Sequence, residues 1–362
     1  MVRILYLCEM AASFQTRRCV EMLGRQLGEG FETEVVTMGI GGSYSNAVVA
    51  GLALRRGRRR WDVIHAWGGR ALGAASLAGT PVIFSPDSLT RVRSLRWLRA
   101  MQSHRAVEVI CPTATLRRLC VERGVPISRC HLIRPGIEFA RIKRRRDSQL
   151  RTALGFSEQD YVILAAGESS RAANHRLAVW TVAIAHLLDE RYKLLVWGRG
   201  GALSSVEHFS RRAHQPEMVS FAEQRLGRAT EFEELLPAAD MVLATANGPV
   251  DPLPIQIAMA AALPIVSTVT YTIGELLEDH HTALLAAKDA PKAIAQRIIE
   301  LRNGASLQWT LADMARTEAY EYFSMSRFLN QYRAAYQQAA KGEAVQVPQS
   351  APGAGMRFHG RA

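Results

Sequence analysis

The chain has 362 residues, which is enough for two domains of ordinary size, and 48% of them are hydrophobic and 22% charged. This balance is typical of a soluble globular protein, and no apolar run reaches the roughly 18 residues that a transmembrane helix needs. The five cysteines include no Cys-x-x-Cys pair, so we expect reduced, buried thiols in a cytoplasmic protein and no metal site.

The net charge is +12, and the excess lies in the first half of the chain. Arginine-rich segments occur at residues 55–60, 91–99 and 141–146. Such segments suit a solvated surface, an anionic membrane or lipid-phosphate acceptor, or nucleic acid. Nucleic acid is the least favoured partner, because aromatic residues are not interleaved with the basic runs. The other two alternatives stay open, and the second would place a cytoplasmic protein at the inner face of a membrane.

Short apolar runs alternate with amphipathic helical patterns throughout the first half. Strands are expected at residues 2–8, 33–38, 62–66, 81–85, 107–112 and 130–133. Helices are expected at residues 15–27, 47–54 and 113–123. This alternation predicts parallel β-α-β units in an open, doubly wound sheet.

A polar stretch at residues 147–160 predicts a domain boundary near residue 150, and the pattern then repeats. Strands are expected at residues 161–166, 193–197, 218–220, 241–244 and 264–267, and helices at 177–188, 204–212, 232–238, 255–262, 272–278 and 290–302.

The sequence therefore predicts an α/β protein with two Rossmann-like domains, at residues 1–150 and 151–317, that face each other across a cleft. A final helix within residues 318–340 is expected to cross back to the first domain. The tail at residues 341–362 is rich in Pro, Gly, Gln and Ser, so we expect it to be disordered.

Several separated segments resemble the retaining glycosyltransferases of family 4, which have the GT-B fold. They are residues 131–138 (HLIRPGIE), 164–167 (LAAG), 195–200 (LVWGRG), 233–242 (EELLPAADMV), 258–266 (AMAAALPIV), 274–275 (GE) and 323–325 (FSM). The resemblance implies transfer of a sugar, of the hexosyltransferase type, from a nucleotide-sugar donor to a hydroxyl acceptor with retention. It also implies a donor side in the second domain, an acceptor side in the first, and no cofactor or metal ion. A lipid-linked acceptor would suit polysaccharide or glycolipid synthesis.

The chain departs from the family at the two glutamates of its Glu-x7-Glu motif. Those positions are Pro249 and Ile257 here, and neither side chain can accept a hydrogen bond. Asp251 is the nearest carboxylate and becomes a candidate catalytic residue. Leu253 and Pro254 match the family's Leu-Pro pair, so both are expected beside the donor.

The family's diphosphate clamp, an Arg and a Lys after the first turn of the second domain, is also replaced. The corresponding positions are Glu168 and Asn174. Arg171 and Arg176 lie in the same segment and could form a displaced clamp, since arginine binds phosphate well. The alternative is a solvated loop at the start of a helix.

In the first domain, residues 10–13 (MAAS) replace the family's Gly-Gly loop. We expect Ser13, His65 and Gly136 to contact the acceptor and Asp87 to be catalytic. Asp87 could instead be a turn or helix-cap residue, and His65 could instead be a packing residue at the end of a strand.

Two hypotheses follow from these matches and departures. The first is an active glycosyltransferase whose expected donor-binding residues are Gly167, Arg171, Asn174, Arg176, Gly198, Leu253 and Pro254. The second is a catalytically degenerate GT-B-fold protein that serves as a binding or scaffold protein.

Overall fold

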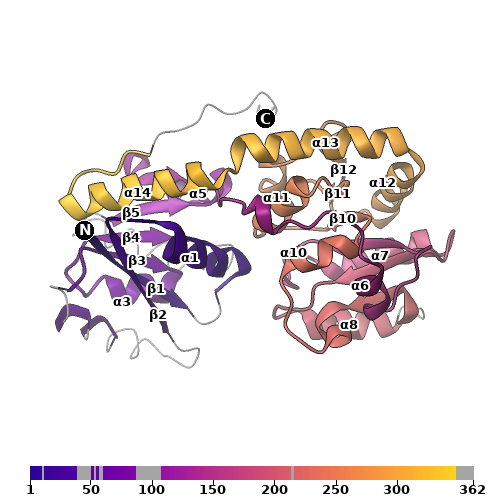
Figure 1. Ribbon diagram of the computed structural model, residues 1–362, viewed down its shortest axis with the longest axis horizontal. Helices are drawn as coiled ribbons and strands as arrows, with labels where there is room; N and C mark the ends of the chain where they lie inside the picture. The colour runs from indigo at the N-terminus through magenta and orange to yellow at the C-terminus, as the bar shows by residue number, and fades with distance from the viewer. Residues whose placement is uncertain are drawn as a thin grey trace. The chain divides into compact units, whose positions relative to one another are not determined.

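The computed structural model describes residues 1–9, 12–38, 50–52, 54–56, 60–86, 107–212 and 216–347. Contacts divide the chain into two compact units (Figure 1). Unit 1 consists of Met1–Gly136 and the segment that begins at Met325, and unit 2 is Ile137–Ser324. Each unit is built on a parallel six-stranded sheet, which confirms the expected α/β class.

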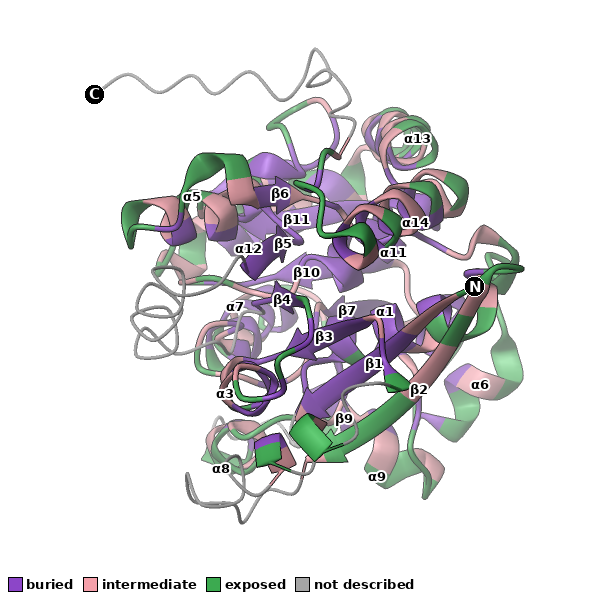
Figure 2. Cartoon of the chain, turned by 90° about the vertical axis from the view of Figure 1, so that its left-hand side faces the viewer, coloured by how far each residue is buried: buried purple, intermediate pink, exposed green. Residues whose placement is uncertain are grey.

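The sheet of unit 1 has the order β2-β1-β3-β4-β5-β6. Its strands are β1 (Val2–Glu9), β2 (Phe31–Met38), β3 (Val63–Trp67), β4 (Val82–Ser85), β5 (Val107–Cys111) and β6 (Cys130–Leu132). The inner strands are apolar on both faces and buried, whereas the edge strand β2 is largely exposed (Figure 2). The chain starts at β1, forms β2 on one side and continues with β3 on the other, so the strand order reverses between β1 and β3.

Helices cover this sheet on both faces. They are α1 (Phe14–Gln26), α3 (Gly69–Ala75), α5 (Ala114–Glu122), the short η2 (Ile127–Arg129) and the last helix, α14 (Met325–Lys341). The helix α14 packs on β1 and β3 through an apolar face that includes Phe328, Tyr332 and Tyr336 (Figure 1). The end of the chain therefore completes the core of unit 1.

The sheet of unit 2 has the order β12-β11-β10-β7-β8-β9. Its strands are β7 (Tyr161–Ala165), β8 (Tyr192–Val196), β9 (Val219–Phe221), β10 (Met241–Ala244), β11 (Ile265–Thr268) and β12 (Leu284–Ala286). The chain begins in the middle of this sheet, runs outward to β9 and returns to β10 beside β7. The strand order therefore reverses between β7 and β10.

The helices of unit 2 are α6 (Ser148–Ala153), α7 (His175–His186), α8 (Leu203–Arg212), α9 (Ala222–Leu226), α10 (Phe232–Leu235), α11 (Leu253–Ala260), α12 (Pro291–Asn303) and α13 (Ala305–Tyr322). Short 3-10 turns add η3 (Phe139–Arg141), η4 (Pro216–Met218), η5 (Leu236–Ala238) and η6 (Ile273–Glu275). The segment expected to be helical at residues 272–278 contains only η6, so that prediction was wrong in extent.

The final helix predicted within residues 318–340 is two helices, α13 and α14, separated at Phe323 and Ser324. The break arises because Ile137 donates its N–H to the Phe323 carbonyl (2.9 Å) and forms a β-bridge with Ser324. The two places where the chain passes between the units, after Gly136 and after Ser324, therefore meet at one point. The passage after Gly136 comes earlier than the boundary expected near residue 150.

The segment that follows α14 is ordered as far as it is described. Val345 is buried in the core of unit 1, and the Gln346 N–H donates to the Gln338 side chain (2.7 Å). The expected disordered tail therefore cannot begin at residue 341. Residues 348–362 lie outside the described part of the chain.

Candidate functional site

Parallel sheets bind ligands at the carboxyl ends of their strands, in the crevice where the strand order reverses. Each unit has one such place, which we call its switch point. The switch point of unit 1 lies at the ends of β1 and β3. The switch point of unit 2 lies at the ends of β7 and β10.

The turn after β7 is tight and is held by close backbone packing. Gly167 has φ +86°, a conformation that glycine adopts freely, and the position of a Cβ there is 3.8 Å from Cγ of Pro254 at the start of α11. The Ser169 N–H donates to the Arg199 carbonyl in the loop after β8 (2.5 Å). Gly200 has φ +114°, and a Cβ there would overlap the Ser169 carbonyl. The loops after β7 and β8 thus fit together only with glycine at residue 200.

His175 holds this turn in place through two hydrogen bonds from a buried position, so it is not placed to bind a phosphate. It is 1% exposed; Nε2 donates to the Ala166 carbonyl (3.2 Å), and Nδ1 accepts from the Ser169 hydroxyl (3.0 Å). Burial lowers the pKa of His175, so the ring is neutral at physiological pH. The role of His175 is to hold the loop to the end of β7.

The start of α7 has no side-chain cap, and the backbone before it is tied to a neighbouring segment. Asn174 precedes the helix with φ 53°, a left-handed conformation that asparagine tolerates, and its side chain makes no capping hydrogen bond. The backbone on either side is tied to the segment after β10: Thr245 Oγ1 donates to the Ala173 carbonyl (3.0 Å), and the Asn247 N–H to the Ala172 carbonyl (2.9 Å). The amino end of a helix carries partial positive charge and favours anions.

The two arginines proposed as a displaced clamp differ in their surroundings. Arg171 is exposed and has no hydrogen-bond or ion-pair partner among the residues that the structure describes. The Arg176 guanidinium lies 4.9 Å from the centre of the Phe209 ring in α8. Arg171 is therefore free to meet an anion, whereas Arg176 is already stacked on an aromatic ring. Glu168 lies in the same loop and is partly exposed.

Asp251 has a structural task at the start of α11. Its Oδ1 accepts a hydrogen bond from the Leu253 N–H (3.1 Å), which satisfies one of the free donors at the beginning of the helix. Leu253, Pro254 and Ile257 are all buried in this helix. A carboxylate engaged in the turn that precedes the helix is a weaker candidate for catalysis than the sequence alone indicates.

The sequence analysis missed Gln256, which lies between Ile255 and Ile257 in α11. Its side chain is fully buried, and neither Oε1 nor Nε2 has a hydrogen-bond partner within the described residues. Leaving such an amide unpaired costs about 1–3 kcal/mol, so a buried polar group of this kind calls for a partner. A single polar residue in an otherwise apolar helix, LPIQIAMA, was the signal that could have revealed it.

Gly198, a predicted donor-binding residue, has an internal partner. Its N–H donates to Glu223 Oε2 (2.6 Å), and a Cβ at this position would overlap that carboxylate. The glycine is therefore needed for Glu223 to approach, and its amide is occupied by the protein itself.

Three residues predicted to contact the acceptor serve the interior of unit 1. Ser13 is buried and caps α1 by accepting from the Thr16 N–H (3.3 Å). Gly136 lies against α14, where a Cβ would come within 2.9 Å of the Phe328 Cβ. Close packing and capping are the contacts that the structure shows for these two residues, and their contact with an acceptor stays a prediction.

His65 is the third, and its surroundings favour the alternative of a packing residue. It is completely buried; Nδ1 is 2.7 Å from the Tyr336 hydroxyl of α14 and Nε2 is 2.8 Å from the Ser85 hydroxyl. Burial lowers the pKa of His65 well below its usual value, so the ring is neutral. With both ring nitrogens occupied, His65 joins the last helix to the sheet.

The switch point of unit 1 carries a carboxylate that the sequence analysis did not single out. Glu9 ends β1, and its Oε1 accepts from the Arg70 N–H at the start of α3 (2.7 Å). Gly68, with φ +94°, is needed there because a Cβ would lie 2.6 Å from that oxygen. The chain's own carboxylate thus occupies the place where an anion would bind.

Some predicted features cannot be placed. Asp87 and the arginines at residues 91–99 lie outside the described residues. Part of the basic segment at residues 141–146 is engaged within unit 2, since Arg146 pairs with Glu158 (3.2 Å) and Asp240 (2.9 Å). Across the described ranges, no helix is both long and apolar enough to cross a membrane.

Comparison with known proteins supplies the family. Residues 160–303 match the model described as "Glycosyl transferases group 1", and residues 20–141 match the model described as "Glycosyltransferase Family 4". A search of curated proteins finds no significant match.

Solved structures agree with the fold. Anabaena Alr3699/HepE in complex with UDP and glucose has a TM-score of 0.78 at 17% identity, over 92% of this chain and 98% of that one. Sucrose-phosphate synthase from Thermosynechococcus elongatus has a TM-score of 0.76 at 14% identity, over 95% and 100%. A glycosyltransferase from Rickettsia africae has a TM-score of 0.74 at 11% identity, over 94% and 99%. With the two family models matching one unit each and together more than half of its length, the chain belongs to the group 1, family 4 glycosyltransferases of GT-B fold.

Proposed function

We propose that the protein is a retaining glycosyltransferase that binds a UDP-sugar at the switch point of unit 2 and transfers the sugar to a hydroxyl acceptor. The observation that carries the proposal is the loop after β7. It brings together a glycine turn, the start of α7 without a side-chain cap, and Arg171, which has no partner among the described residues. Support comes also from HepE, which has been crystallised with UDP-glucose and shares the fold.

Each element of this loop has a task in binding a nucleoside diphosphate. The start of α7 offers backbone N–H groups and a favourable dipole to a phosphate. Arg171 supplies a fixed positive charge, which the family's usual lysine would give at the position of Asn174. Gly167 leaves room for the diphosphate to approach the backbone. In a retaining transfer the leaving diphosphate can itself accept the acceptor's proton, so positioning and charge would be the main contributions of the protein.

We propose further that Gln256 replaces part of what the missing glutamates provide. Its amide lies one residue before the position of the family's second glutamate, Ile257, and it is fully buried with no hydrogen-bond partner among the described residues. If donor binding displaces the side chains that cover it, a ribose or sugar hydroxyl could satisfy either amide atom, since the amide donates and accepts. This assignment would explain how a donor binds although Pro249 and Ile257 carry no acceptor.

The degenerate scaffold remains the second candidate function, and a specific observation favours it. Ile257 is only 2% exposed, so an apolar, closed surface stands where the family has its ribose-binding carboxylate. The Gly198 amide and Asp251 are also engaged in internal hydrogen bonds. A protein that has lost its donor site would keep these contacts for stability alone.

Calorimetric titration of the full chain with UDP separates the two functions. We expect binding in the wild type and a loss of about 1.5–3 kcal/mol, which is roughly a 10- to 150-fold increase in Kd, in Arg171→Ala. Arg176→Ala is the matched control, and its affinity should change much less because that side chain is stacked on Phe209. Absence of any binding by folded wild-type protein would favour the scaffold, and equal losses in the two variants would remove Arg171 from its assigned role.

A further inference from the structure

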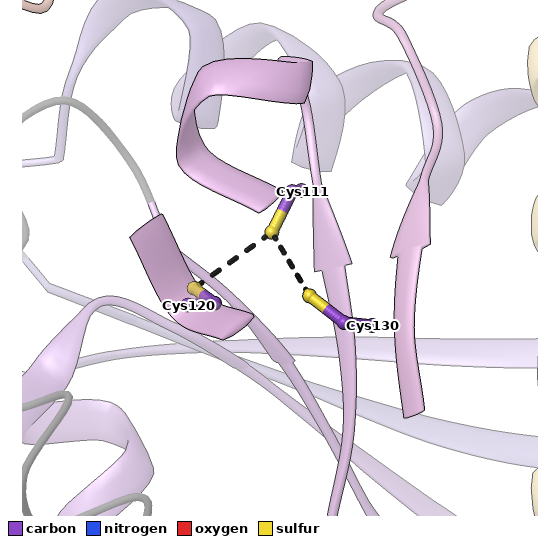
Figure 3. Close-up of side chains that lie close together, drawn as sticks. All are labelled: Cys111, Cys120 and Cys130. Atoms are coloured by element: carbon purple, nitrogen blue, oxygen red, sulfur yellow. Dashed lines mark hydrogen bonds between the residues drawn. The ribbon is translucent and has the colours of Figure 1, made fainter. Parts of the chain in front are cut away.

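Three cysteines from three elements that follow one another closely in the chain converge in the core of unit 1. Cys111 ends β5, Cys120 lies in α5 and Cys130 begins β6 (Figure 3). Sγ of Cys111 is 3.9 Å from Sγ of Cys120 and 3.9 Å from Sγ of Cys130, and all three sulfurs lie within 4.8 Å of one another. None of the three residues is more than 1% exposed.

The backbone holds these sulfurs in place before any ligand arrives. Cys111 and Cys130 belong to paired parallel strands, and Val109 is the direct partner of Cys130. Cys120 is fixed by the end of α5: the Val125 N–H donates to the Cys120 carbonyl (3.1 Å) and the Gly124 N–H to the Val121 carbonyl (2.9 Å). This is a Schellman arrangement with glycine in the left-handed position. Strand pairing and the end of α5 therefore fix the backbone that carries the three sulfurs.

The spacing fits a shared metal ion better than a disulfide between the two strands. Sulfurs bound at about 2.3 Å to one ion stand about 3.8–4.0 Å apart. Cys111 and Cys130 are offset by two residues on neighbouring strands, which places their Cα atoms about 8 Å apart. A disulfide needs Cα atoms closer than about 7 Å, so this pair cannot be bridged without moving the backbone.

A cation lies beside the cluster. Arg117 Nε donates to the Cys130 carbonyl (2.8 Å). A nearby positive charge favours the thiolate, which is the form that binds metals.

We propose that Cys111, Cys120 and Cys130 form a buried three-sulfur site for copper(I). Soft thiolate ligands select copper(I) or zinc, and a closed pocket with three sulfurs suits the lower coordination number of copper(I). Zinc sites take four ligands, and among the described residues no His, Asp, Glu or further Cys joins these three. Binding displaces thiol protons to solvent, and the ion keeps its oxidation state.

The test is an anaerobic titration of the reduced, metal-free full chain with copper(I) in competition with bathocuproine disulfonate. We expect one tight equivalent per chain in the wild type, its loss in Cys120→Ala, and its retention in Cys19→Ala. Cys19 is the matched control because it is a buried cysteine in the separate core cluster beneath α14. Circular dichroism checks the fold of each variant.

X-ray absorption spectroscopy of the copper-loaded wild type counts the sulfur ligands of the ion directly, so it tests the site even if Cys120→Ala fails to fold. Three sulfurs at bonding distance support the site. No competition-resistant copper in the wild type, fewer than three sulfur ligands, or equal loss in Cys19→Ala would overturn it. A parallel zinc titration that gives tighter binding than copper(I) would overturn the choice of ion. A disulfide among the three cysteines in protein that binds no copper after reduction would replace the metal site by a redox pair.

Discussion

The switch points of the two units differ in what occupies them. In unit 1 the chain fills its own site: Glu9 receives the N–H at the start of α3, and Ser13 caps α1. In unit 2 the start of α7 has no side-chain cap, and Arg171 extends without a partner in the described part of the chain. Both sheets are parallel and have one reversal of strand order, yet this place is satisfied internally in unit 1 and carries unmet charge in unit 2. We infer that anion binding resides in unit 2.

The largest expected effect comes from breaking the fit between the loops of unit 2. In Gly200→Ala the new Cβ would overlap the Ser169 carbonyl at a left-handed backbone position, so we expect a loss of about 2–4 kcal/mol in stability. UDP affinity should fall with it, because the loop after β7 must move. The neighbouring Gly201→Ala, whose Cβ meets nothing within 4 Å, is the control and should be nearly neutral. Chemical denaturation measures the stability of each variant, and calorimetric titration measures its UDP affinity. Similar stabilities for the two variants would contradict the described loop packing.

The second prediction concerns the tie between α14 and the sheet of unit 1. His65→Leu leaves the Tyr336 and Ser85 hydroxyls buried without their partner, which should cost about 2–4 kcal/mol. UDP affinity of the folded variant should be unchanged, because the residue has no ligand role. Hydrogen exchange should show faster exchange in β3 and α14. A specific loss of ligand affinity with normal stability would restore His65 as a substrate-binding residue.

The third prediction uses pH to compare the two units. His65 in unit 1 and His175 in unit 2 both have lowered pKa values when folded, because both are buried. In the unfolded chain both histidines take up a proton near pH 6.5, whereas in the folded chain they stay neutral at that pH. The free energy of unfolding therefore decreases as the pH falls below about 6.5. Each group should contribute a slope of up to about 1.4 kcal/mol per pH unit. His65→Gln should weaken the pH dependence of protection against hydrogen exchange in unit 1 alone, and His175→Gln should weaken it in unit 2 alone. If neither variant changes the pH dependence, other groups are responsible for it.

The smallest effect is expected at Asp251. Asp251→Ala removes the acceptor for the Leu253 N–H and should cost about 0.5–2 kcal/mol. Asp251→Asn keeps an acceptor oxygen and should restore most of that stability. If sugar transfer is detected, its rate in Asp251→Asn should stay close to that of the wild type. A large drop in kcat in this stable variant would instead return Asp251 to a catalytic role.

Short-range periodicity predicted the strands of both sheets except β12, and it predicted α11 with a start at residue 255, two residues after the observed start at Leu253. The turn at Gly167 and the Leu253–Pro254 pair were expected from the resemblance to the family. Local patterns did not predict the roles of Ser13, His65 or Gly136. Those roles depend on contacts made by α14, or on a hydrogen bond that satisfies a helix end, and neither leaves a periodic trace. The same reason hid the cysteine cluster: residues 111, 120 and 130 have no ligand spacing along the chain and meet only when β5, α5 and β6 fold together.

The central claim is that unit 2 alone provides the nucleotide site, and hydrogen–deuterium exchange of the full chain with and without UDP tests it most directly. We predict protection of residues 167–176 and 253–257 at the ends of β7 and β10, with no change at residues 9, 12–16 and 65–70 of unit 1. Protection at the end of β1 or β3 instead, or none in either unit at saturating UDP, would contradict the account.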